Sequence, residues 1–440
     1  MNYYETLEFL FSQLPAYHRI GKAAYRNNLD NTNLLDKHFG YPHQKFRSVH
    51  VAGTNGKGSV SNLLASILQE AGYRTGLYTS PHLIDFRERI RVDGKMIPEE
   101  DVVAFVEANR AIIEEIKPSF FEMTVAMAFD HFAKQEVDVA VIEVGLGGRL
   151  DSTNIITPLL SVITNIGHDH MDLLGDTLEK VAEEKAGIIK QGIPIIIGET
   201  NSLTAPVFRG KAADSGSEIL FADQIFRCDF ADFEPASNGR RYIITDNLHH
   251  EVIKGVSALS GDYQQKNLVT IAAAVSNLRK NFLITDKNLI DGISRVAQNT
   301  GFSGRWQVLS AQPLIICDTG HNKEGLEYVM SQLQCARFRE LHIIMGFVND
   351  KDISSILPLF PVNAKYYFTK ASVNRALNES ILRERAEAYS LKGECYSNVS
   401  EAIISACRNA SDEDLIFIGG STFVVGDAMN YFEKRAGSIM

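Results

Sequence analysis

The sequence predicts a two-domain α/β protein, in which a larger domain with a mostly parallel sheet and a small antiparallel sheet precedes a smaller Rossmann-like α/β domain. Apolar, β-branched runs alternate with helical stretches between residues 46 and 198, and a second alternation begins after residue 304. Residues 299–304 lie between them and are rich in turn formers, which indicates a domain junction. We therefore expect one domain at residues 1–298 and another at residues 299–440.

The first alternation predicts the main sheet. Helical stretches separate its apolar runs, and such crossovers join parallel strands. The expected strands are 46–51, Thr75–Thr79, Val137–Val144, Leu160–Ile166 and Ile193–Gly198, and the expected helices are 60–71, Glu99–Ile116, Thr124–Lys134 and Thr177–Lys190.

The pattern then loosens between residues 200 and 256. Short alternating segments such as Glu218–Phe226 and Arg241–Thr245 predict antiparallel strands packed against the main sheet. Helices at Asp262–Arg279 and Lys287–Gln298 are expected to close the first domain. The second domain's expected strands are Leu314–Cys317, Leu341–Met345, Lys365–Phe368 and Leu415–Ile418.

A glycine-rich loop follows the first expected strand, and Val51–Ser59 reads Val-Ala-Gly-Thr-Asn-Gly-Lys-Gly-Ser. The loop opens a helix, where unpaired N–H groups and the helix dipole favour phosphate and where Lys57 can neutralise its charge. It departs from the general P-loop pattern because Gly58 stands between Lys57 and the hydroxyl of Ser59. We interpret it as an ATP-binding loop of a P-loop ATPase domain, formed by Gly53, Thr54, Asn55, Gly56, Lys57, Gly58 and Ser59.

The composition limits the partners of this chain. A net charge of −10 argues against non-specific nucleic-acid binding, which needs a basic face. No apolar run approaches the roughly 18 residues that span a bilayer, and the first residues lack the basic region of a secretion signal, so we expect a cytoplasmic protein without membrane contact. Five scattered cysteines fit reduced thiols better than a disulfide framework or a zinc site.

Polar side chains follow several expected strands, where parallel sheets bind their ligands. They include Ser80, Glu143 and His170. Mg²⁺ prefers oxygen ligands, so Ser80 and Glu143 are reasonable ligands, whereas His170 is a less usual one and has a structural role as its alternative. The run Gly145–Arg149 is either a weak nucleotide loop or a flexible turn.

Three other groups of residues allow two interpretations each. Arg87, Arg89, Arg91 and Lys95 are either a local anion site or a solvated strand edge. Arg305 lies at the junction, either as a ligand group or as part of a hinge. The segment Asp318–Asn322, which includes His321, is either a phosphate or ribose contact or a helix cap.

Short motifs also occur in a fixed order along nearly the whole chain. They are Gly53–Ser59, Thr79–Leu83, Glu88–Ile90, Phe121–Thr124, Glu143–Asn154, His168–His170, Lys185–Lys190, Gly261–Asn267, Gly304-Arg305 and Asp318–Asn322. Together they resemble the folylpolyglutamate synthases and dihydrofolate synthases of the Mur ligase superfamily. The chain departs from that family's more usual Asp-Gly-Ala-His-Asn at residues 318–322 and Pro-Arg at residues 374–375.

The resemblance implies an ATP-dependent amide ligase that joins L-glutamate to dihydropteroate or to a reduced folate through an acyl phosphate. It implies ATP on the loop Gly53–Ser59, a first Mg²⁺ on Ser80, Glu143 and His170, and charge neutralisation by Lys57 and Arg305. Asn267 and Asp318 resemble adenine-side and ribose-side contacts. His321 resembles a catalytic residue near the glutamate site or at the second domain's catalytic edge, and Arg305 is also expected to be catalytic and to contact ATP. A monomer is usual for the family.

Lys185 has a role only through the resemblance, because its pattern alone indicates a solvated helix lysine. Its family counterpart is carbamylated by CO₂ and becomes an anionic ligand of a second Mg²⁺. We therefore expect Lys185 to be both a catalytic residue and a metal ligand.

Three alternatives to a bifunctional folate ligase remain. The enzyme could extend folates only, or it could be another Mur-type ligase acting on a different carboxylate. A nucleotide-gated regulatory or motor NTPase is the third, although such a switch would not require Glu143, His170 and Lys185 together.

Overall fold

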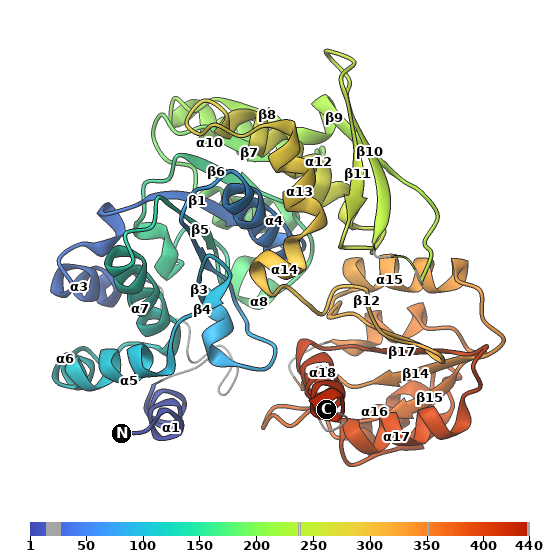
Figure 1. Cartoon of the computed structure of the whole chain (residues 1–440). Helices are drawn as coiled ribbons and strands as arrows, with labels where there is room; N and C mark the ends of the chain where they lie inside the picture. The colour runs from blue at the N-terminus through green and yellow to red at the C-terminus, as the bar shows by residue number, and fades with distance from the viewer. Residues whose placement is uncertain (15–27, 236, 238, 350–351, 438–440) are drawn as a thin grey trace.

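The computed structural model describes residues 1–14, 28–235, 237, 239–349 and 352–437. Within these residues the strands form sheets of eight, three and six strands. Figure 1 shows the first two sheets in the upper part of the molecule and the third, in orange and red, at the lower right. This arrangement confirms the expected α/β fold class.

The eight-stranded sheet has the order β4-β3-β2-β5-β1-β6-β7-β8. The strands from β2 to β8 in this order are parallel, and β3 and β4 extend the sheet as an antiparallel edge. The strands are β1 (Arg47–Ala52), β2 (Thr75–Tyr78), β3 (Ile90–Val92), β4 (Lys95–Met96), β5 (Val139–Glu143), β6 (Leu160–Ile163), β7 (Ile195–Ile197) and β8 (Ile219–Phe221).

Helices cover both faces of this sheet, which explains its nearly continuous apolar strands. Along β5, Val139 and Val141 pack into one core, whereas Ala140 and Ile142 pack into another on the opposite face. The first core is completed by α4 (Lys57–Glu70), α12 (Gln264–Leu278), α13 (Asp286–Ser294) and α14 (Val296–Thr300). The second is completed by α1 (Tyr3–Gln13), α3 (Asp30–His38), α5 (Glu99–Ala108), α6 (Arg110–Ile116) and α7 (Phe120–Lys134).

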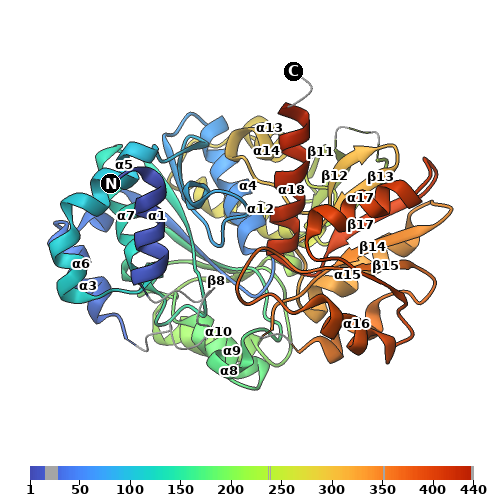
Figure 2. The ribbon, with the colours of Figure 1, turned by 90° about the horizontal axis from the view of Figure 1, so that it is seen from below.

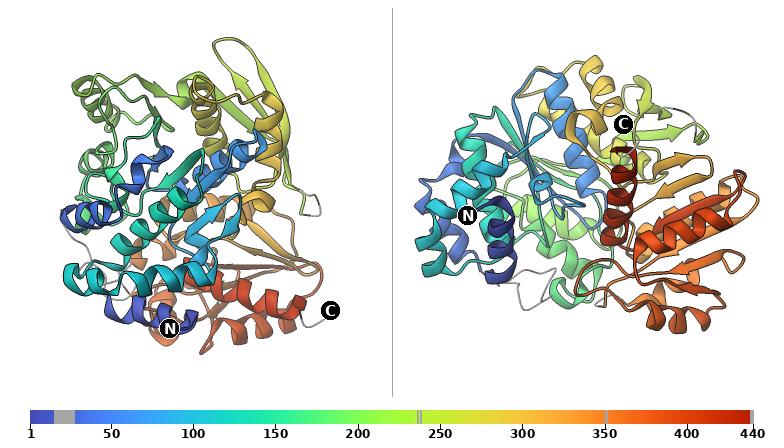
Figure 3. Two further views of the ribbon diagram at one scale, coloured as in Figure 1. Left: turned by 60° about the vertical axis from the view of Figure 1, so that its left-hand side comes forward. Right: turned by 60° about the horizontal axis from the view of Figure 1, so that its bottom comes forward.

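Shorter elements complete the larger domain. They are α8 (Met171–Leu174), α9 (Leu178–Ala186), α10 (Ala205–Asp214) and α11 (Ala222–Ile225), with 3₁₀ turns η2 (Pro42–Gln44), η3 (Phe86–Arg89) and η4 (Ser152–Ile155). The right-hand view of Figure 3 shows the N-terminal helices, in blue and cyan, on the opposite side of the molecule from the third sheet, in orange and red.

Three expectations about this domain are wrong. The helix expected at Lys287–Gln298 is divided at Arg295 into α13 and α14. The helix expected at Glu99–Ile116 is interrupted at Asn109, whose side chain donates a 2.7 Å hydrogen bond to the Phe105 carbonyl and competes with the helical pattern. The segment Glu218–Phe226 was expected in the antiparallel sheet. Instead, β8 pairs in parallel with β7 and extends the main sheet, because Ile195–Ile197 offers it an apolar edge.

The three-stranded sheet has the order β11-β10-β9 and is antiparallel, as expected. Its strands are β9 (Phe226–Phe230), β10 (Arg240–Asp246) and β11 (Val252–Ser257). Cys228, Tyr242 and Ile244 point from it into the core that holds α12. This sheet therefore supports the helix that carries Asn267.

The third sheet has the order β12-β13-β17-β14-β15-β16, with β12 antiparallel to an otherwise parallel sheet. All four strands expected for this domain are present, whereas β12 and β16 were not predicted. The strands are β12 (Gln307–Ala311), β13 (Leu314–Cys317), β14 (Leu341–Met345), β15 (Lys365–Phe368), β16 (Gly393–Cys395) and β17 (Leu415–Gly419). The helices are α15 (Lys323–Cys335), α16 (Glu379–Glu387), α17 (Val399–Asn409) and α18 (Thr422–Gly437), with η5 (Ile353–Ser355) and η6 (Leu357–Leu359).

Two elements of the third sheet's domain face the larger domain. Figure 2 shows α18 along the side turned toward it. Gly426 of α18 lies so close to the loop after β2 that an added Cβ would be 2.4 Å from the Leu83 carbonyl oxygen. The other facing element is the start of α15, which borders the cavity described below. Among the described residues, no helix combines the length and apolar character needed to cross a membrane.

Candidate active site

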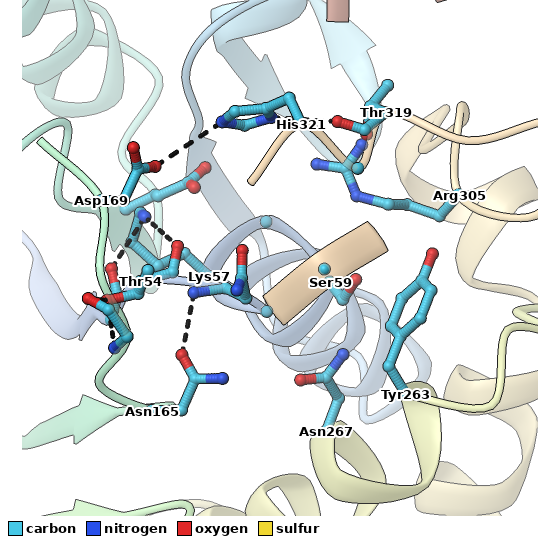
Figure 4. A pocket seen from close by; sticks show the side chains of 18 of the residues that line it. Thr54, Lys57, Ser59, Asn165, Asp169, Tyr263, Asn267, Arg305, Thr319 and His321 are labelled. Atoms are coloured by element: carbon cyan, nitrogen blue, oxygen red, sulfur yellow. Dashed lines mark hydrogen bonds and ion pairs between the residues drawn. The ribbon is translucent and has the colours of Figure 1, made fainter. Parts of the chain in front are cut away.

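A cavity of about 460 Å³ lies between the carboxyl ends of the main-sheet strands and the second domain. All site residues that the sequence predicts line its wall, and they come from both domains. Figure 4 labels Lys57 and Asn267 of the first domain and Arg305 and His321 of the second. The first domain contributes Gly53–Ser59, Ser80, Glu143, His170, Lys185 and Asn267, and the second contributes Arg305, Asp318 and His321.

The phosphate loop is a tight turn between β1 and α4. Gly53 has φ +148° and Gly56 has φ +85°, and added Cβ atoms would lie 1.9 Å from Thr164 Oγ1 and 2.3 Å from Asn267 Oδ1. Both positions therefore require glycine. Gly58 differs, because a Cβ there would make only ordinary contacts, at 3.6 Å or more, with Phe302 and Glu143.

Two lysine side chains converge on one carbonyl group of this loop. The Nζ atoms of Lys57 and Lys185 donate to the Gly53 carbonyl oxygen at 2.8 and 2.9 Å. Burial lowers the pKa of both amines, and the positive charge of Lys57 contributes to lowering that of Lys185 to about 7. Lys185 is thus a buried amine of unusually low basicity and not the solvated helix lysine that its pattern indicates.

Glu143 ends β5 and is buried in the cavity wall. Burial raises the pKa of its carboxyl group to about 7, against the opposing positive charge of Lys57. One Glu143 oxygen accepts a 3.2 Å hydrogen bond from the Ser80 backbone N–H. His170 lies on the same wall, with a left-handed backbone (φ +51°) where α8 begins. The structure therefore brings a carboxylate, a hydroxyl and an imidazole to one cavity.

The buried side chain of Gln264 holds Asn267 and Ser59, which both line the cavity. The Gln264 amide donates to Ser59 Oγ at 3.1 Å and accepts from Asn267 Nδ2 at 2.7 Å. The hydroxyl of Ser59 is thus held against α12, and the Asn267 amide oxygen faces Gly56 of the phosphate loop.

The second domain presents Arg305, Asp318 and His321 to the cavity. Both oxygens of Asp318 already accept hydrogen bonds within the protein, from Gly320 N at 2.7 Å, Trp306 N at 2.8 Å and Tyr263 Oη at 2.6 Å. The Arg305 guanidinium lies over the Phe302 ring at 5.6 Å. His321 Nδ1 lies 3.0 Å from the Thr319 carbonyl oxygen, and its Nε2 lies 3.6 Å from Asp169 (Figure 4).

Several residues of this cavity carry no role in the sequence prediction. Asp169, Tyr263 and Glu324 all line it and contact the opposite domain. Asp169 and Tyr263 lie inside motifs that the sequence contains, His168–His170 and Gly261–Asn267, so their positions could have indicated them. Glu324 offers no such signal, because an acidic residue in the first turn of a helix is common.

The basic residues after β2 do not form one cluster. Arg87 is paired with Asp85 and Glu99, whereas Arg89 is buried, donates to His82 Nδ1 at 2.8 Å and stacks on Phe120. Arg91 lines the cavity and Lys95 is exposed on β4. The interpretation as a solvated strand edge is thus correct for Lys95 alone.

The run Gly145–Arg149 is a turn built into the cavity wall. An added Cβ on Gly145 would lie 2.4 Å from the Phe121 ring, and Gly147 has φ +69°. Asp151 fixes the turn by accepting a 2.9 Å hydrogen bond from Leu146 N. Gly145, Leu146 and Gly147 line the cavity, so packing shapes this turn.

A second group of acidic and imidazole side chains lies in the other domain, at the amino ends of its strands. Glu340, His342 and Asp414 could bring their ligand atoms within 4.8 Å of one another. However, Asp414 already pairs with Arg339 at 3.0 Å and Glu340 with Lys365 at 2.6 Å. These cations neutralise the cluster, so it is a structural ion-pair network.

Comparison with known families agrees with this geometry. The Mur ligase middle domain family matches residues 51–275, and the Mur ligase glutamate ligase domain family matches residues 304–422. The folylpolyglutamate synthase of Lacticaseibacillus casei is 32% identical over 431 residues, covering 95% of this chain and 96% of that protein. The dihydrofolate synthase/folylpolyglutamate synthase of Bacillus subtilis is 32% identical over 420 residues, covering 92% and 95%.

A longer relative and two solved structures extend the comparison. A probable bifunctional folylpolyglutamate synthase/dihydropteroate synthase of Haloferax volcanii is 31% identical over 97% of this chain, which spans about half, 50%, of that relative's length. Escherichia coli FolC in complex with DHPP and ADP has a TM-score of 0.85 at 27% identity, with 99% of both chains covered. Mycobacterium tuberculosis folylpolyglutamate synthase complexed with ADP has a TM-score of 0.86 at 28% identity, with 98% of both covered. The chain therefore belongs to the Mur ligase family, in the branch that holds the folylpolyglutamate and dihydrofolate synthases.

Proposed function

We propose that this chain is an ATP-dependent ligase that attaches L-glutamate to dihydropteroate and then extends reduced folates with further glutamates. The observation that carries the proposal is the single cavity in which the phosphate loop and Glu143 of one domain face Arg305 and His321 of the other. The names of the relatives and the ADP complexes of FolC and of the Mycobacterium enzyme support it.

The residues of the loop fit ATP. Gly53 and Gly56 bring the backbone into a turn that no side chain could enter, and Lys57 lies at the start of α4. A helix N-terminus with close backbone approach and a lysine fits a polyphosphate. Lys57 and Arg305 would neutralise the negative charge that collects when ATP and a carboxylate approach each other.

The donor set of Glu143, Ser80 and His170 fits Mg²⁺ in part. Glu143 and Ser80 supply the oxygen ligands that this hard cation prefers, and His170 supplies a nitrogen. Glu143 is the strongest argument, because a buried carboxylate needs a counter-charge and burial raises the pKa of this group. When bound, Mg²⁺ would polarise phosphoryl oxygens.

Lys185 fits a carbamate. Only a neutral amine adds CO₂, and burial lowers the pKa of Lys185 to about 7. The resulting anion would relieve the charge conflict between Lys185 and Lys57, whose amines share the Gly53 carbonyl. In this proposal the carbamylated Lys185 is a ligand of a second Mg²⁺.

The chemistry is phosphoryl transfer followed by acyl transfer. The substrate carboxylate oxygen attacks the terminal phosphorus of ATP, which forms the acyl phosphate and releases ADP. The amine of L-glutamate then attacks the acyl carbon, a C–N bond forms, the C–O bond to phosphate breaks, and the nitrogen loses its extra proton. His321 projects from the second domain toward Asp169 and is placed to contact the incoming glutamate in this proposal.

The proposal also covers the organisation of the chain. Residues 1–298 form the ATP-binding unit and residues 299–440 the glutamate ligase unit, which is supported by the change of sheet between β11 and β12. A cytoplasmic monomer is part of the proposal, and light scattering of the purified chain tests whether it is a monomer.

The decisive experiment measures ADP release with ATP, Mg²⁺ and L-glutamate in the presence of dihydropteroate, tetrahydrofolate or no acceptor, and identifies the products by mass. We expect turnover with both acceptors and none without an acceptor. Turnover with tetrahydrofolate alone would leave an extending folylpolyglutamate synthase. If neither acceptor gave ADP release, the folate assignment would be wrong and another Mur-type ligase would be favoured.

A further inference from the structure

Two asparagine side chains meet beside the cavity and join the two domains. Asn55 belongs to the phosphate loop, and Asn322 precedes α15 of the second domain. Asn322 Nδ2 donates to Asn55 Oδ1 at 3.0 Å, and Asn55 Nδ2 donates to Asn322 Oδ1 at 3.3 Å. The amides therefore form a reciprocal pair.

Each asparagine is rigidly held on its own side. Asn322 is 5% exposed, and its Oδ1 also caps α15 by accepting from Gly325 N at 2.9 Å. The backbone N–H of Asn55 donates to Asn165 Oδ1 at 2.8 Å, and the carbonyl oxygen of Asn55 accepts from Thr164 Oγ1 at 2.5 Å. A shift of α15 would therefore be transmitted to the middle of the phosphate loop.

The segment at the start of α15 also contacts a second loop of the first domain, which contains His168 and Asp169. Glu324 Oε1 accepts a hydrogen bond from His168 N at 2.9 Å, and His321 Nε2 lies 3.6 Å from Asp169 Oδ2. The two loops are themselves joined, because Thr54 Oγ1 accepts from Gly167 N at 2.9 Å. The start of α15 thus contacts both loops that border the phosphate site.

We propose that the Asn55–Asn322 pair is a closure latch, through which docking of the second domain holds the phosphate loop in the conformation that transfers phosphate. The inference rests on the proposed ligase function. Asn322 would act through Asn55 and is therefore a positioning residue. The contact reaches the loop at Asn55, between Gly53 and Gly56, whose positive φ angles place this stretch in a conformation that glycine adopts readily. Phosphoryl transfer is governed by this kind of positioning.

The test uses serine at both positions. In N322S the hydroxyl can still cap α15, but it is too short to reach Asn55. N55S removes the other half of the pair and leaves the backbone contacts to Asn165 and Thr164 in place. The matched control is N398S, because Asn398 caps α17 of the same domain through a 2.9 Å bond from Glu401 N, is exposed and lies outside the cavity.

We expect kcat to fall about tenfold in N322S and in N55S, because each variant loses the reciprocal pair of amide hydrogen bonds. The KM for ATP should change less than about threefold, since the phosphate-binding N–H groups remain. The double variant N55S/N322S should be no slower than either single variant. N398S should keep the wild-type kcat. The proposal would be refuted if the double variant lost kcat by the product of the two single-variant factors, or if N322S kept the wild-type kcat.

A second readout does not depend on ligase activity. Hydrogen exchange measured by mass spectrometry should be faster over the peptide that contains residues 53–58 in N322S, and unchanged there in N398S. Unchanged exchange in N322S would overturn the latch even if the ligase function holds. If the wild type turns over no folate acceptor, the proposed function fails, while this exchange result still decides whether α15 restrains the loop.

Discussion

Tyr263 at the start of α12 donates a 2.6 Å hydrogen bond to Asp318 at the end of β13, and this bond links the two domains beside the cavity. Burial raises the pKa of both groups. The phenol therefore stays neutral and serves as a donor. The residue that the sequence suggested as a ribose contact is thus also a structural link between the domains.

Removing this hydroxyl in Y263F should destabilise the protein by about 1–2 kcal/mol, because a buried carboxylate loses a donor. Asp318 keeps its bonds from Trp306 N and Gly320 N, so the domain should still fold. We also expect kcat/KM for ATP to fall about tenfold, since Arg305 and Asp318 would be less firmly placed. Thermal melting and steady-state kinetics measure the two effects.

Y242F is the matched control. Tyr242 is also buried, but its hydroxyl has no hydrogen-bond partner among the described residues. Its removal should leave kcat/KM unchanged and cost less than about 0.5 kcal/mol. An equal loss of activity in both variants would show that the Tyr263–Asp318 bond has no special role.

The glycines of the phosphate loop should respond differently to alanine. G53A would place a Cβ 1.9 Å from Thr164 Oγ1, so it should lower the melting temperature and abolish ADP binding. G58A would meet its nearest neighbour, the Phe302 ring, at 3.6 Å and should keep the wild-type melting temperature. Scanning calorimetry measures the melting temperatures of both variants, and titration calorimetry measures their binding of ADP. A large fall in the melting temperature of G58A would contradict the packing described around Gly58.

The sequence predicted the β-strands best where they are buried on both faces. Leu314–Cys317, Leu341–Met345 and Lys365–Phe368 have the predicted bounds, because continuous apolar runs of that length suit central parallel strands. The edge strands β12 and β16 were missed, since edge positions carry mixed side chains. β8 was given to the wrong sheet, because strand periodicity does not specify the partner strand.

The site residues could be predicted wherever a short stretch of sequence contains the residue types that the chemistry needs. Gly53–Ser59 indicated a phosphate loop from residue types alone, and the structure places it at the start of α4. The role of Lys185 could be predicted only through the family resemblance, because its burial and its contact with Gly53, which is distant in the sequence, arise only in the fold. The Asn55–Asn322 contact joins residues 267 positions apart, and no spacing rule could have indicated it.

Lys185 should be essential for ligation. K185A removes the amine that would carry the carbamate, and ADP release should fall below about one hundredth of the wild-type rate. K180A is the control on the same helix, because Lys180 is exposed and pairs only with Asp176 among the described residues. Full activity of K185A would rule out the carbamate.

The carbamate itself should depend on CO₂. Wild-type enzyme in CO₂-depleted buffer should lose activity and regain it when bicarbonate is added, and ¹³C-labelled bicarbonate should give a carbamate signal by NMR. Since the neutral amine is the reactive form and the pKa of Lys185 is about 7, the recovery should be faster at pH 8 than at pH 6 when the concentration of dissolved CO₂ is held equal at the two pH values. A labelled signal that persists in K185A would assign the carbamate to another lysine.

His50 should make the protein sensitive to acid. Its ring is fully buried in β1, with Nε2 2.9 Å from Thr153 Oγ1, and burial lowers its pKa from 6.5 to about 3. Above pH 6.5 the ring is neutral in both the folded and unfolded states, whereas between pH 6.5 and pH 3 only the unfolded state gains the proton. Stability should therefore fall with decreasing pH, by up to about 1.4 kcal/mol per pH unit from this group.

The variant H50Q keeps a polar side chain near Thr153 but has no titrating ring, so its urea midpoint should fall less steeply between pH 6.5 and pH 4 than that of the wild type. H249N is the control, because His249 is an exposed ring beside Asp246, which raises its pKa. Protonated His249 stabilises the folded state in acid through its pairing with Asp246. Removing this ring should therefore not make the fall in stability with decreasing pH any shallower. Equal slopes for H50Q and the wild type would show that His50 is protonated in the folded protein or that the acid response comes from other buried groups.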